Sequence, residues 1–255
     1  MIKLLSSSVF SFPKEPPRKN EDSILPPRKV GNGFLMAIAD GVGSYAGASS
    51  ASESAIDYLT SLQSTAFESS DAAEQIFNEI KTRVSNLTHE NPSYFDAATT
   101  LTFCYAGEKG IRIGHVGDCR VYLKVDHRLV QVTKDHTQYQ MLIDEGLYKP
   151  SELKEASGKN TLFSAISKKI NLHFQEIFLK YDQICGHDGS VSLFIMSDGA
   201  YHPWELRPRF LESTLEDPNR FAANLRRRIA RLGATDDCSL IAVKLTIKPQ
   251  LELFD

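Results

Sequence analysis

The chain has 255 residues, of which 42% are hydrophobic and 24% are charged, and its net charge is −3. This length allows a large hydrophobic core, and the small negative charge gives no support to a nucleic-acid or membrane-surface role. No stretch approaches the roughly 20 apolar residues of a membrane-spanning helix, and the first residues lack a signal-peptide pattern. The four cysteines lack metal-binding spacing, so we interpret them as reduced thiols and expect a cytoplasmic protein.

The first part of the chain predicts strands alternating with helices. A strand is expected over about 3–12, and a loop over 13–23, where several prolines deny the backbone a regular ladder. A buried strand then ends at Asp40, and small residues predict a closely packed helix over about 46–63. A second helix is expected from an N-cap at Ser70 or Asp71, with apolar residues at helical spacing at Ile76, Phe77, Ile80, Val84 and Leu87.

The second part predicts a meander of antiparallel strands over 98–133, then a polar, helical excursion from the sheet over about 136–170. Strands are expected to resume near 174 and 191. The last helix is expected between Asp217 and Gly233, followed by a final strand over 238–247. We interpret the arginines of its LRRRIAR stretch as solvated charges that complement the helix dipole. Without a repeat or a long linker, we predict a single domain over 1–255.

Acidic residues stand where the expected buried strands end. Two apolar runs, FLMAIADG and SLFIMSDG, stop at Asp40 and Asp198, each followed by glycine. One such aspartate is commonly a turn former or a helix cap, but two suggest a shared site. Asp22 stands just beyond the proline-rich loop, and Asp236 stands in the turn before the last strand. If these groups meet, carboxylates about 4–5 Å apart would repel by roughly 3–4 kcal/mol per pair at an effective dielectric near 20. A divalent cation would offset that repulsion, and oxygen donors favour Mg²⁺ or Mn²⁺ over Zn²⁺.

Short motifs, in a fixed order along the chain, allow a more specific interpretation than a metal site alone. They are RKNEDS at 18–23, ADGVGSYAGA at 39–48, DAATTL at 96–101, GHVGDCRVYL at 114–123, TKDHT at 133–137, MSDGAY at 196–201 and ATDDCSL at 234–240. In this order they resemble the metal-dependent protein serine/threonine phosphatases, the PPM or type 2C family, in its compact bacterial-like form. The resemblance covers essentially the whole chain, from about residue 5 to 247.

The resemblance implies an α+β fold. Two mostly antiparallel sheets pack face to face with helices outside, which gives a four-layer α-β-β-α sandwich with a two-metal centre at one end. It also implies that 136–170 is a flap beside this centre. By resemblance the ligands of two Mg²⁺ or Mn²⁺ ions are assigned as follows: Asp40 bridges both ions, the Gly41 carbonyl joins one, Asp198 and Asp236 bind one, and Asp22 and Glu21 bind through water.

Several positions depart from the family pattern. Arg18, the implied phosphate-gripping residue, stands four rather than five residues before Asp22. Val42 replaces a histidine that eukaryotic members use as a candidate general acid. We align Asp236 with the metal ligand and treat Asp237 as supporting it. A third, weak ion is implied at Asp118 and Asp198, but His202 stands where bacterial relatives often carry an acid.

These residues lead to an expected enzyme, a phosphoprotein phosphatase. Metal-activated water would attack phosphoserine or phosphothreonine directly in protein substrates, and Asp40 and Arg18 would be its catalytic residues. A cognate kinase would be its natural counterpart. The alternative is a catalytically weak or inactive phosphatase-like module that binds phosphorylated partners for regulation. Hydrolysis of a small phosphorylated metabolite is a third interpretation.

Overall fold

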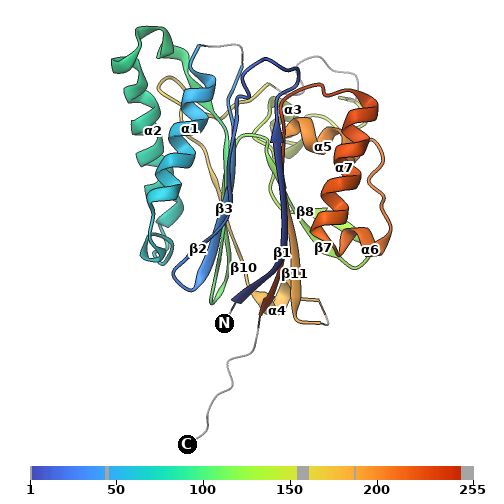
Figure 1. The fold of residues 1–255 in the computed structure, drawn as a ribbon. Coiled ribbons are helices and arrows are strands. Elements are labelled where there is room, and N and C mark those ends of the chain that lie inside the picture. Colours follow the sequence, from blue (N-terminus) through green and yellow to red (C-terminus); the bar gives the residue numbers. More distant parts are fainter. Residues whose placement is uncertain (1, 44–45, 154–160, 187, 248–255) are drawn as a thin grey trace, which may run out of the picture.

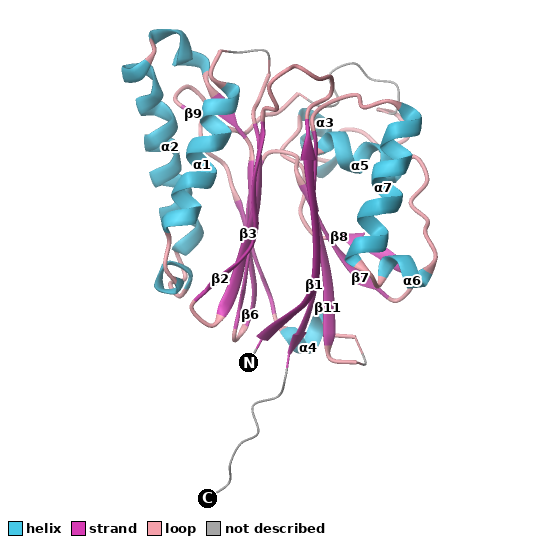
Figure 2. Ribbon diagram, viewed as in Figure 1, coloured by secondary structure: helices cyan, strands magenta, loops and turns pink. Residues whose placement is uncertain are grey.

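The computed structural model describes residues 2–43, 46–153, 161–186 and 188–247 and arranges them in four layers (Figures 1 and 2). Two sheets of antiparallel strands lie face to face in the middle. The β11 sheet has the order β1 (Ile2–Phe12), β12 (Cys238–Ile247), β11 (Ser190–Met196), β7 (Arg120–Val125) and β8 (Arg128–Gln131). The β3 sheet has the order β10 (Gln175–Leu179), β6 (Gly110–Val116), β5 (Leu101–Gly107), β3 (Gly33–Asp40) and β2 (Asp22–Val30).

Helices cover the outer face of each sheet, so the expected α-β-β-α sandwich is confirmed (Figure 2). Helices α1 (Ala48–Ser61) and α2 (Ala72–Glu90) lie on the β3 sheet. Helices α5 (Asp198–Glu205), α6 (Glu212–Leu215) and α7 (Pro218–Leu232) lie on the β11 sheet. Shorter elements are the helices α3 (Gln138–Asp144) and α4 (Tyr181–Ile184), the 3₁₀ turns Ser64–Phe67 and Pro92–Asp96, and the strand pair β4 (Ala98–Thr99) and β9 (Ile166–Ser167).

The two apolar runs are central strands buried on both faces. In β3, Met36 and Ile38 pack between the sheets, whereas Leu35 and Ala37 pack against α1 and α2. In β11 the same alternation directs Leu193 and Ile195 between the sheets and Phe194 and Met196 towards α5 and α7. Because a strand covered on both faces needs no polar positions, the run stays apolar until it leaves the core. Its first polar side chain is therefore placed at the end of the sheet.

Helix ends follow the sequence signals closely. In α7 the Asp217 carboxylate accepts hydrogen bonds from the Asn219 and Arg220 amides, Pro218 occupies the first turn, and Gly233 ends the helix. In α2, Asp71 is the N-cap position, and all five apolar residues expected to face the core are buried. The predicted start of α2 and the predicted bounds of α7 and β12 are confirmed.

One expectation about the chain path was wrong. The strand β2 was missed because Pro26 and Pro27 lie inside it; it is an edge strand, and its pairing with β3 slips between Leu25 and Arg28, where the prolines are tolerated. The excursion expected over 136–170 is described only in part. Helix α3 occupies only part of it, residues 154–160 lie outside the described residues, and Ile166–Ser167 has already returned to pair with β4.

All four cysteines are free thiols, as expected: Cys104, Cys119 and Cys238 are buried and Cys185 is half-buried. In the described part of the chain, every helix falls short of the length or hydropathy needed to span a bilayer.

Candidate metal centre

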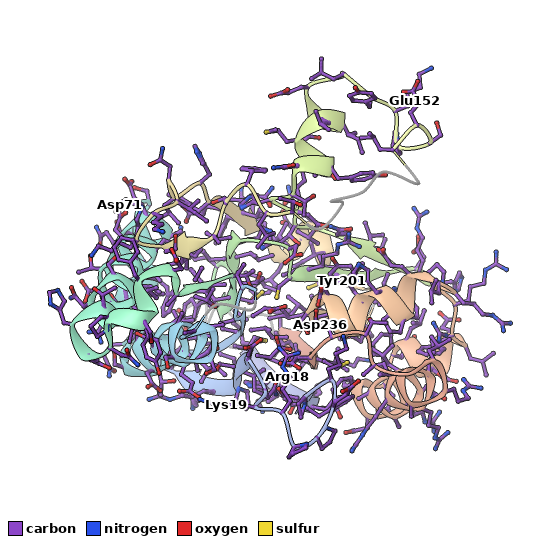
Figure 3. The ribbon with its side chains drawn as sticks, turned by 90° about the horizontal axis from the view of Figure 1, so that it is seen from above. Arg18, Lys19, Asp71, Glu152, Tyr201 and Asp236 are labelled. Atoms are coloured by element: carbon purple, nitrogen blue, oxygen red, sulfur yellow. The ribbon has the colours of Figure 1, made fainter. Side chains whose placement is uncertain are left out.

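The acidic side chains singled out in the sequence gather where the two sheets end together. Asp40 is the last residue of β3, and Asp22, the first residue of β2, is its cross-strand partner. From the other sheet, Asp198 is separated from the end of β11 by one residue, Ser197, and Asp236 is separated from the start of β12 by one residue, Asp237. Asp118 lies between β6 and β7. Figure 3 looks down on this end and labels Asp236, Arg18 and Tyr201 near its middle.

The Asp40 backbone is fixed by hydrogen bonds to its neighbours in the chain's first half. Its amide donates to Thr100 Oγ1 at 3.0 Å, and its carbonyl accepts from the Thr100 amide at 2.8 Å and from Thr99 Oγ1 at 3.0 Å. The Gly41 amide donates to the Glu21 carbonyl at 3.1 Å. A Cβ on Gly41 would lie 2.8 Å from the Ala48 carbonyl oxygen, so only glycine fits this approach to α1.

Ser197, which the sequence analysis passed over, joins the two sheets under the carboxylates. Its hydroxyl donates to Asp22 Oδ2 at 2.9 Å and accepts from the Ser239 amide at 2.9 Å. Because Asp22 belongs to the β3 sheet and Ser239 to the β11 sheet, this buried hydroxyl fixes one sheet against the other. The only sequence signal for it was its place beside Asp198 in the MSDG motif.

Asp236 and Asp237 have different surroundings although they are adjacent. Asp237 is buried, and its two oxygens accept from the backbone amides of Lys14 at 2.8 Å and Glu21 at 2.6 Å. Asp236 is exposed at the same end of the sandwich. Asp237 therefore holds the proline-rich loop against the site, which leaves Asp236 as the carboxylate available to a ligand.

Arg18 lies on that loop with its side chain largely exposed. Its guanidinium forms an ion pair with the Glu21 carboxylate, and this negative charge raises the pKa of Arg18 above its usual range. Two of the expected site residues are therefore paired with each other. Arg18 would have to leave Glu21 before it could bind a phosphate.

The carboxylates destabilise one another as charged groups. Burial raises the pKa of Asp22 and of Asp118 to about 7. Burial, and then the negative charges of the neighbouring aspartates, raise the pKa of Asp40 and of Asp198 well above the usual range. One oxygen of Asp22 and one of Asp198, the Oδ1 atoms, are buried without a hydrogen-bond partner. Positive charge placed at this end of the molecule would therefore stabilise the ionised carboxylates.

Arg120 does not supply this positive charge, because its guanidinium is already paired with other groups beside the site. Its guanidinium binds both oxygens of Asp135, at 2.6 Å for the shortest contact, and forms an ion pair with Glu205 at 2.6 Å. It also stacks 3.8 Å above the ring of Tyr201, which ties β7 to α5.

His136 is held against the turn between β6 and β7 by two hydrogen bonds. The His136 amide donates to the Gly117 carbonyl at 2.7 Å, and the Gly117 amide donates to His136 Nδ1 at 3.2 Å. His115 is a packed residue that bonds Thr102 at 2.8 Å, and His173 is exposed; both agree with the sequence interpretation.

The donor set fits a hard divalent cation, being all oxygen, acidic and partly unpartnered. Within the described ranges, however, no three acidic, histidine or cysteine side chains are gathered tightly enough to hold an ion as they stand. A bound ion would draw the side chains inward and would offset their mutual repulsion.

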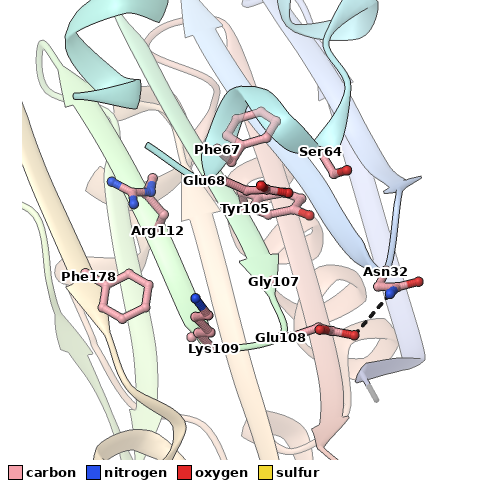
Figure 4. A pocket seen from close by; sticks show the side chains of 11 residues that line it. Asn32, Ser64, Phe67, Glu68, Tyr105, Gly107, Glu108, Lys109, Arg112 and Phe178 are labelled. Carbon is pink, nitrogen blue, oxygen red and sulfur yellow. Dashed lines mark hydrogen bonds between the residues drawn. The ribbon is translucent and has the colours of Figure 1, made fainter. Parts of the chain in front are cut away.

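A hollow of about 550 Å³ lies elsewhere and does not belong to this centre (Figure 4). Tyr105, Phe67 and Arg112 line it, and Asn32 bonds Glu108 at 3.0 Å along its rim. Because Asn32 precedes β3 and Asp40 ends it, the rim of the hollow at Asn32 lies roughly 25 Å from the carboxylates along the strand.

The family model described as protein phosphatase 2C matches residues 18–246. The serine/threonine protein phosphatase PstP of Mycobacterium tuberculosis is 31% identical over 154 residues; the match covers 58% of this chain but only 28% of that protein's length. The serine/threonine phosphatase of S. agalactiae has the same fold, with a TM-score of 0.79 at 17% identity over 97% of this chain and 100% of that one. The PstP catalytic domain in complex with two manganese ions gives a TM-score of 0.72 at 22% identity, over 97% and 100% of the two chains.

Proposed function

The chain belongs to the protein phosphatase 2C family, and we propose on that premise that it hydrolyses phosphoserine and phosphothreonine in proteins with the help of two Mg²⁺ or Mn²⁺ ions. The observation that carries the proposal is the gathering of Asp22, Asp40 and Asp198 at one end of the sandwich, with two buried acidic oxygens unpartnered. The manganese-bound PstP relative supports the choice of metal.

Each residue of the candidate metal centre has a proposed role. Asp40, the Gly41 carbonyl, Asp198 and Asp236 would hold the ions, and Asp22 and Glu21 would support them. Bound there, the ions would supply an activated water and offset the phosphoryl charge. The chain's own part is to fix the acidic oxygens from two sheets, which Ser197 and the Thr99–Thr100 contacts do.

Arg18 is proposed to orient the phosphate with its guanidinium, which matches phosphate oxygens in a bidentate arrangement. The dianionic substrate would take the place of Glu21 as its partner, and Asp237 would keep the loop in position during that exchange. A covalent enzyme intermediate is not part of the proposal. Phosphatases with an aspartyl nucleophile need Asp-x-Asp, and here Val42 and Ala200 stand at the second position.

The substrates are phosphoproteins, a serine/threonine kinase is the counterpart, and the reaction takes place in the cytoplasm. The chain acts as one phosphatase domain, and Asp118 with Asp198 provides a third, weak ion site.

Hydrolysis of p-nitrophenyl phosphate and of phosphopeptides, with and without Mn²⁺, tests the function. We expect metal-dependent turnover of both that a chelator abolishes. Phosphopeptide binding without turnover would contradict the proposal and favour a regulatory module, and a preference for sugar phosphates over phosphopeptides would contradict the substrate class. Replacing Arg18 by alanine is expected to raise KM about tenfold, whereas Lys19→Ala, a matched change at the next residue, is expected to leave it unchanged.

A further inference from the structure

A groove of about 600 Å³ lies on the outer side of the helices that cover the β11 sheet. It is formed by the loop at 206–211, between α5 and α6, and by the last two turns of α7. None of the motifs discussed above includes the loop. We call this feature the α7 groove.

Leucine side chains are unusually exposed around the α7 groove. Leu206 is 75% exposed, Leu211 is 77% exposed and Leu232 is 55% exposed, and all three line it. Leu206 and Leu211 are the two most exposed large apolar side chains in the described part of the chain. Such a concentration of apolar surface typically marks an interaction site.

The same groove carries positive charge without a counter-charge. Arg207, Arg209 and Arg231 line it, and none forms an ion pair with any residue that the structure describes. Arg231 lies in the last turn of α7, where the helix dipole accounts for it. That explanation does not extend to Arg207 and Arg209, which come from the loop.

A fourth arginine, Arg228, holds the loop in place and corrects the expectation that all arginines of this helix are solvated. It is buried, and its guanidinium donates to the carbonyls of Trp204 at 3.1 Å, Arg207 at 2.7 Å and Arg209 at 3.3 Å. It also stacks 4.4 Å from the ring of Phe210. The exposed arginines and leucines are thus presented by an anchored loop, and Arg228 adds a fixed positive charge beneath them.

The position of the α7 groove relates it to the candidate metal centre. Leu232, which lines the groove, ends α7, and only residues 233–235 separate it from Asp236. A polypeptide segment in the groove could therefore continue towards the carboxylates without crossing the molecule.

We propose that the α7 groove binds an acidic, leucine-bearing segment of the protein substrate at a distance from its phosphorylated residue. The arginines match carboxylates in charge and geometry, and the leucines match apolar side chains. A concave surface fits a polypeptide segment better than a flat lipid headgroup layer. That the bound segment belongs to a substrate rests on the proposed function, whereas binding of such a segment in the groove does not.

Fluorescence anisotropy with a labelled, unphosphorylated peptide of about a dozen residues, rich in glutamate and leucine, tests the binding. We expect binding that the double variant Arg207→Gln/Arg209→Gln and the double variant Leu206→Ser/Leu211→Ser each weaken at least tenfold. The matched control is Arg226→Gln/Arg227→Gln, which removes the same charge from exposed positions of α7 outside the groove. Equal weakening by the control, or no binding to the unsubstituted protein, would overturn the proposal.

Two further measurements separate the alternatives. Anionic phospholipid vesicles that bind through Arg207 and Arg209, while the peptide does not, would make the α7 groove a membrane-binding surface and overturn the proposal. In turnover assays, the Arg207→Gln/Arg209→Gln variant is expected to lose kcat/KM towards a phosphopeptide joined to the acidic segment but not towards p-nitrophenyl phosphate. An unsubstituted protein that binds the peptide and hydrolyses neither compound would refute the proposed function and leave the groove as a binding site.

Discussion

The dipeptide Asp-Gly stands at the end of β3, as Asp40-Gly41, and one residue beyond the end of β11, as Asp198-Gly199, yet the chain supports the two ends differently. After Asp40 the backbone stays extended, and Thr99, Thr100 and Glu21 bind it on both sides. After β11 the chain turns at once into α5, and one Asp198 oxygen is buried without a partner.

The glycines of the two ends are needed for one reason, the approach of another backbone. At Gly41 that backbone belongs to Ala48, and at Gly199 it belongs to Asp237, whose carbonyl oxygen would lie 2.2 Å from an added Cβ. The comparison shows that contacts with backbone from other parts of the chain fix the position of each Asp-Gly pair. One short motif can thus provide carboxylates from two separate sheets.

Removing either charge should have the largest effect. Asp40→Asn and Asp198→Asn are each expected to lower metal-dependent kcat/KM by more than about 100-fold, since an amide cannot replace a carboxylate that holds a cation. The same variants should melt at a higher temperature than the unsubstituted protein in chelator at pH 8, because a buried, repelled charge is gone. Steady-state kinetics and thermal melts check both, with Asp57→Asn on the exposed face of α1 as control. A lower melting temperature in chelator would contradict the repulsion described here.

The two glycines should respond unequally to an added methyl group. Gly199→Ala is expected to cost about 3 kcal/mol of unfolding free energy, and Gly41→Ala less, because the closest backbone atom lies at 2.2 Å in one case and 2.8 Å in the other. Denaturant titrations give both values. Gly186→Ala is the control, since its closest contact is a side-chain oxygen at 3.2 Å. Equal losses of unfolding free energy at all three positions would show that the close backbone approaches are not the reason for these glycines.

Asp237 should matter less than its neighbour Asp236. Asp237→Asn keeps one acceptor for the two backbone amides of the 13–21 loop, so we expect KM to rise about tenfold through a displaced Arg18, with the metal requirement unchanged. Asp236→Asn should instead raise the Mn²⁺ concentration needed for half-maximal rate. A metal titration of both variants distinguishes them, and the reverse pattern would exchange the roles assigned to the two residues.

The smallest effect expected is on stability against pH. Because burial raises the pKa of Asp22 and Asp118 to about 7, their protonated forms stabilise the folded protein, and this contribution is lost as pH rises through about 7. His115 and His136, with pKa values lowered to about 3 and about 4, act in the opposite direction, but only below their ordinary pKa of 6.5. In chelator the melting temperature should therefore fall by a few degrees between pH 6.5 and 8.5. Mn²⁺ should restore it at the higher pH, and a rise in chelator would contradict the assignment.

Local patterns predicted much of the fold. The uninterrupted apolar runs indicated β3 and β11, and the Asp217-Pro218 and Gly233 signals indicated both ends of α7. The strand β2 was not predicted because prolines are rare inside strands, and only its place at the sheet edge explains the two that it contains. Short-range signals cannot reveal which strands lie at an edge.

The candidate site was predictable as a set of residues but not as a set of contacts. Motif order pointed to Asp22, Asp40 and Asp198, whereas nothing in the sequence indicated that Ser197 bonds Asp22 across 175 positions. The burial of Arg228 was equally hidden, because its partners are backbone carbonyls at the end of α5 and in the loop that follows, and carbonyls have no sequence signature. Long-range polar contacts are what the sequence patterns leave out.

The central claim is that carboxylates from both sheets share a pair of hard cations. Anomalous X-ray scattering from crystals soaked in Mn²⁺ tests it most directly. We predict two manganese peaks at this end of the sandwich, both in contact with Asp40 and at least one with Asp198. Manganese bound to carboxylates of one sheet only, or no peak beside Asp40, would contradict it.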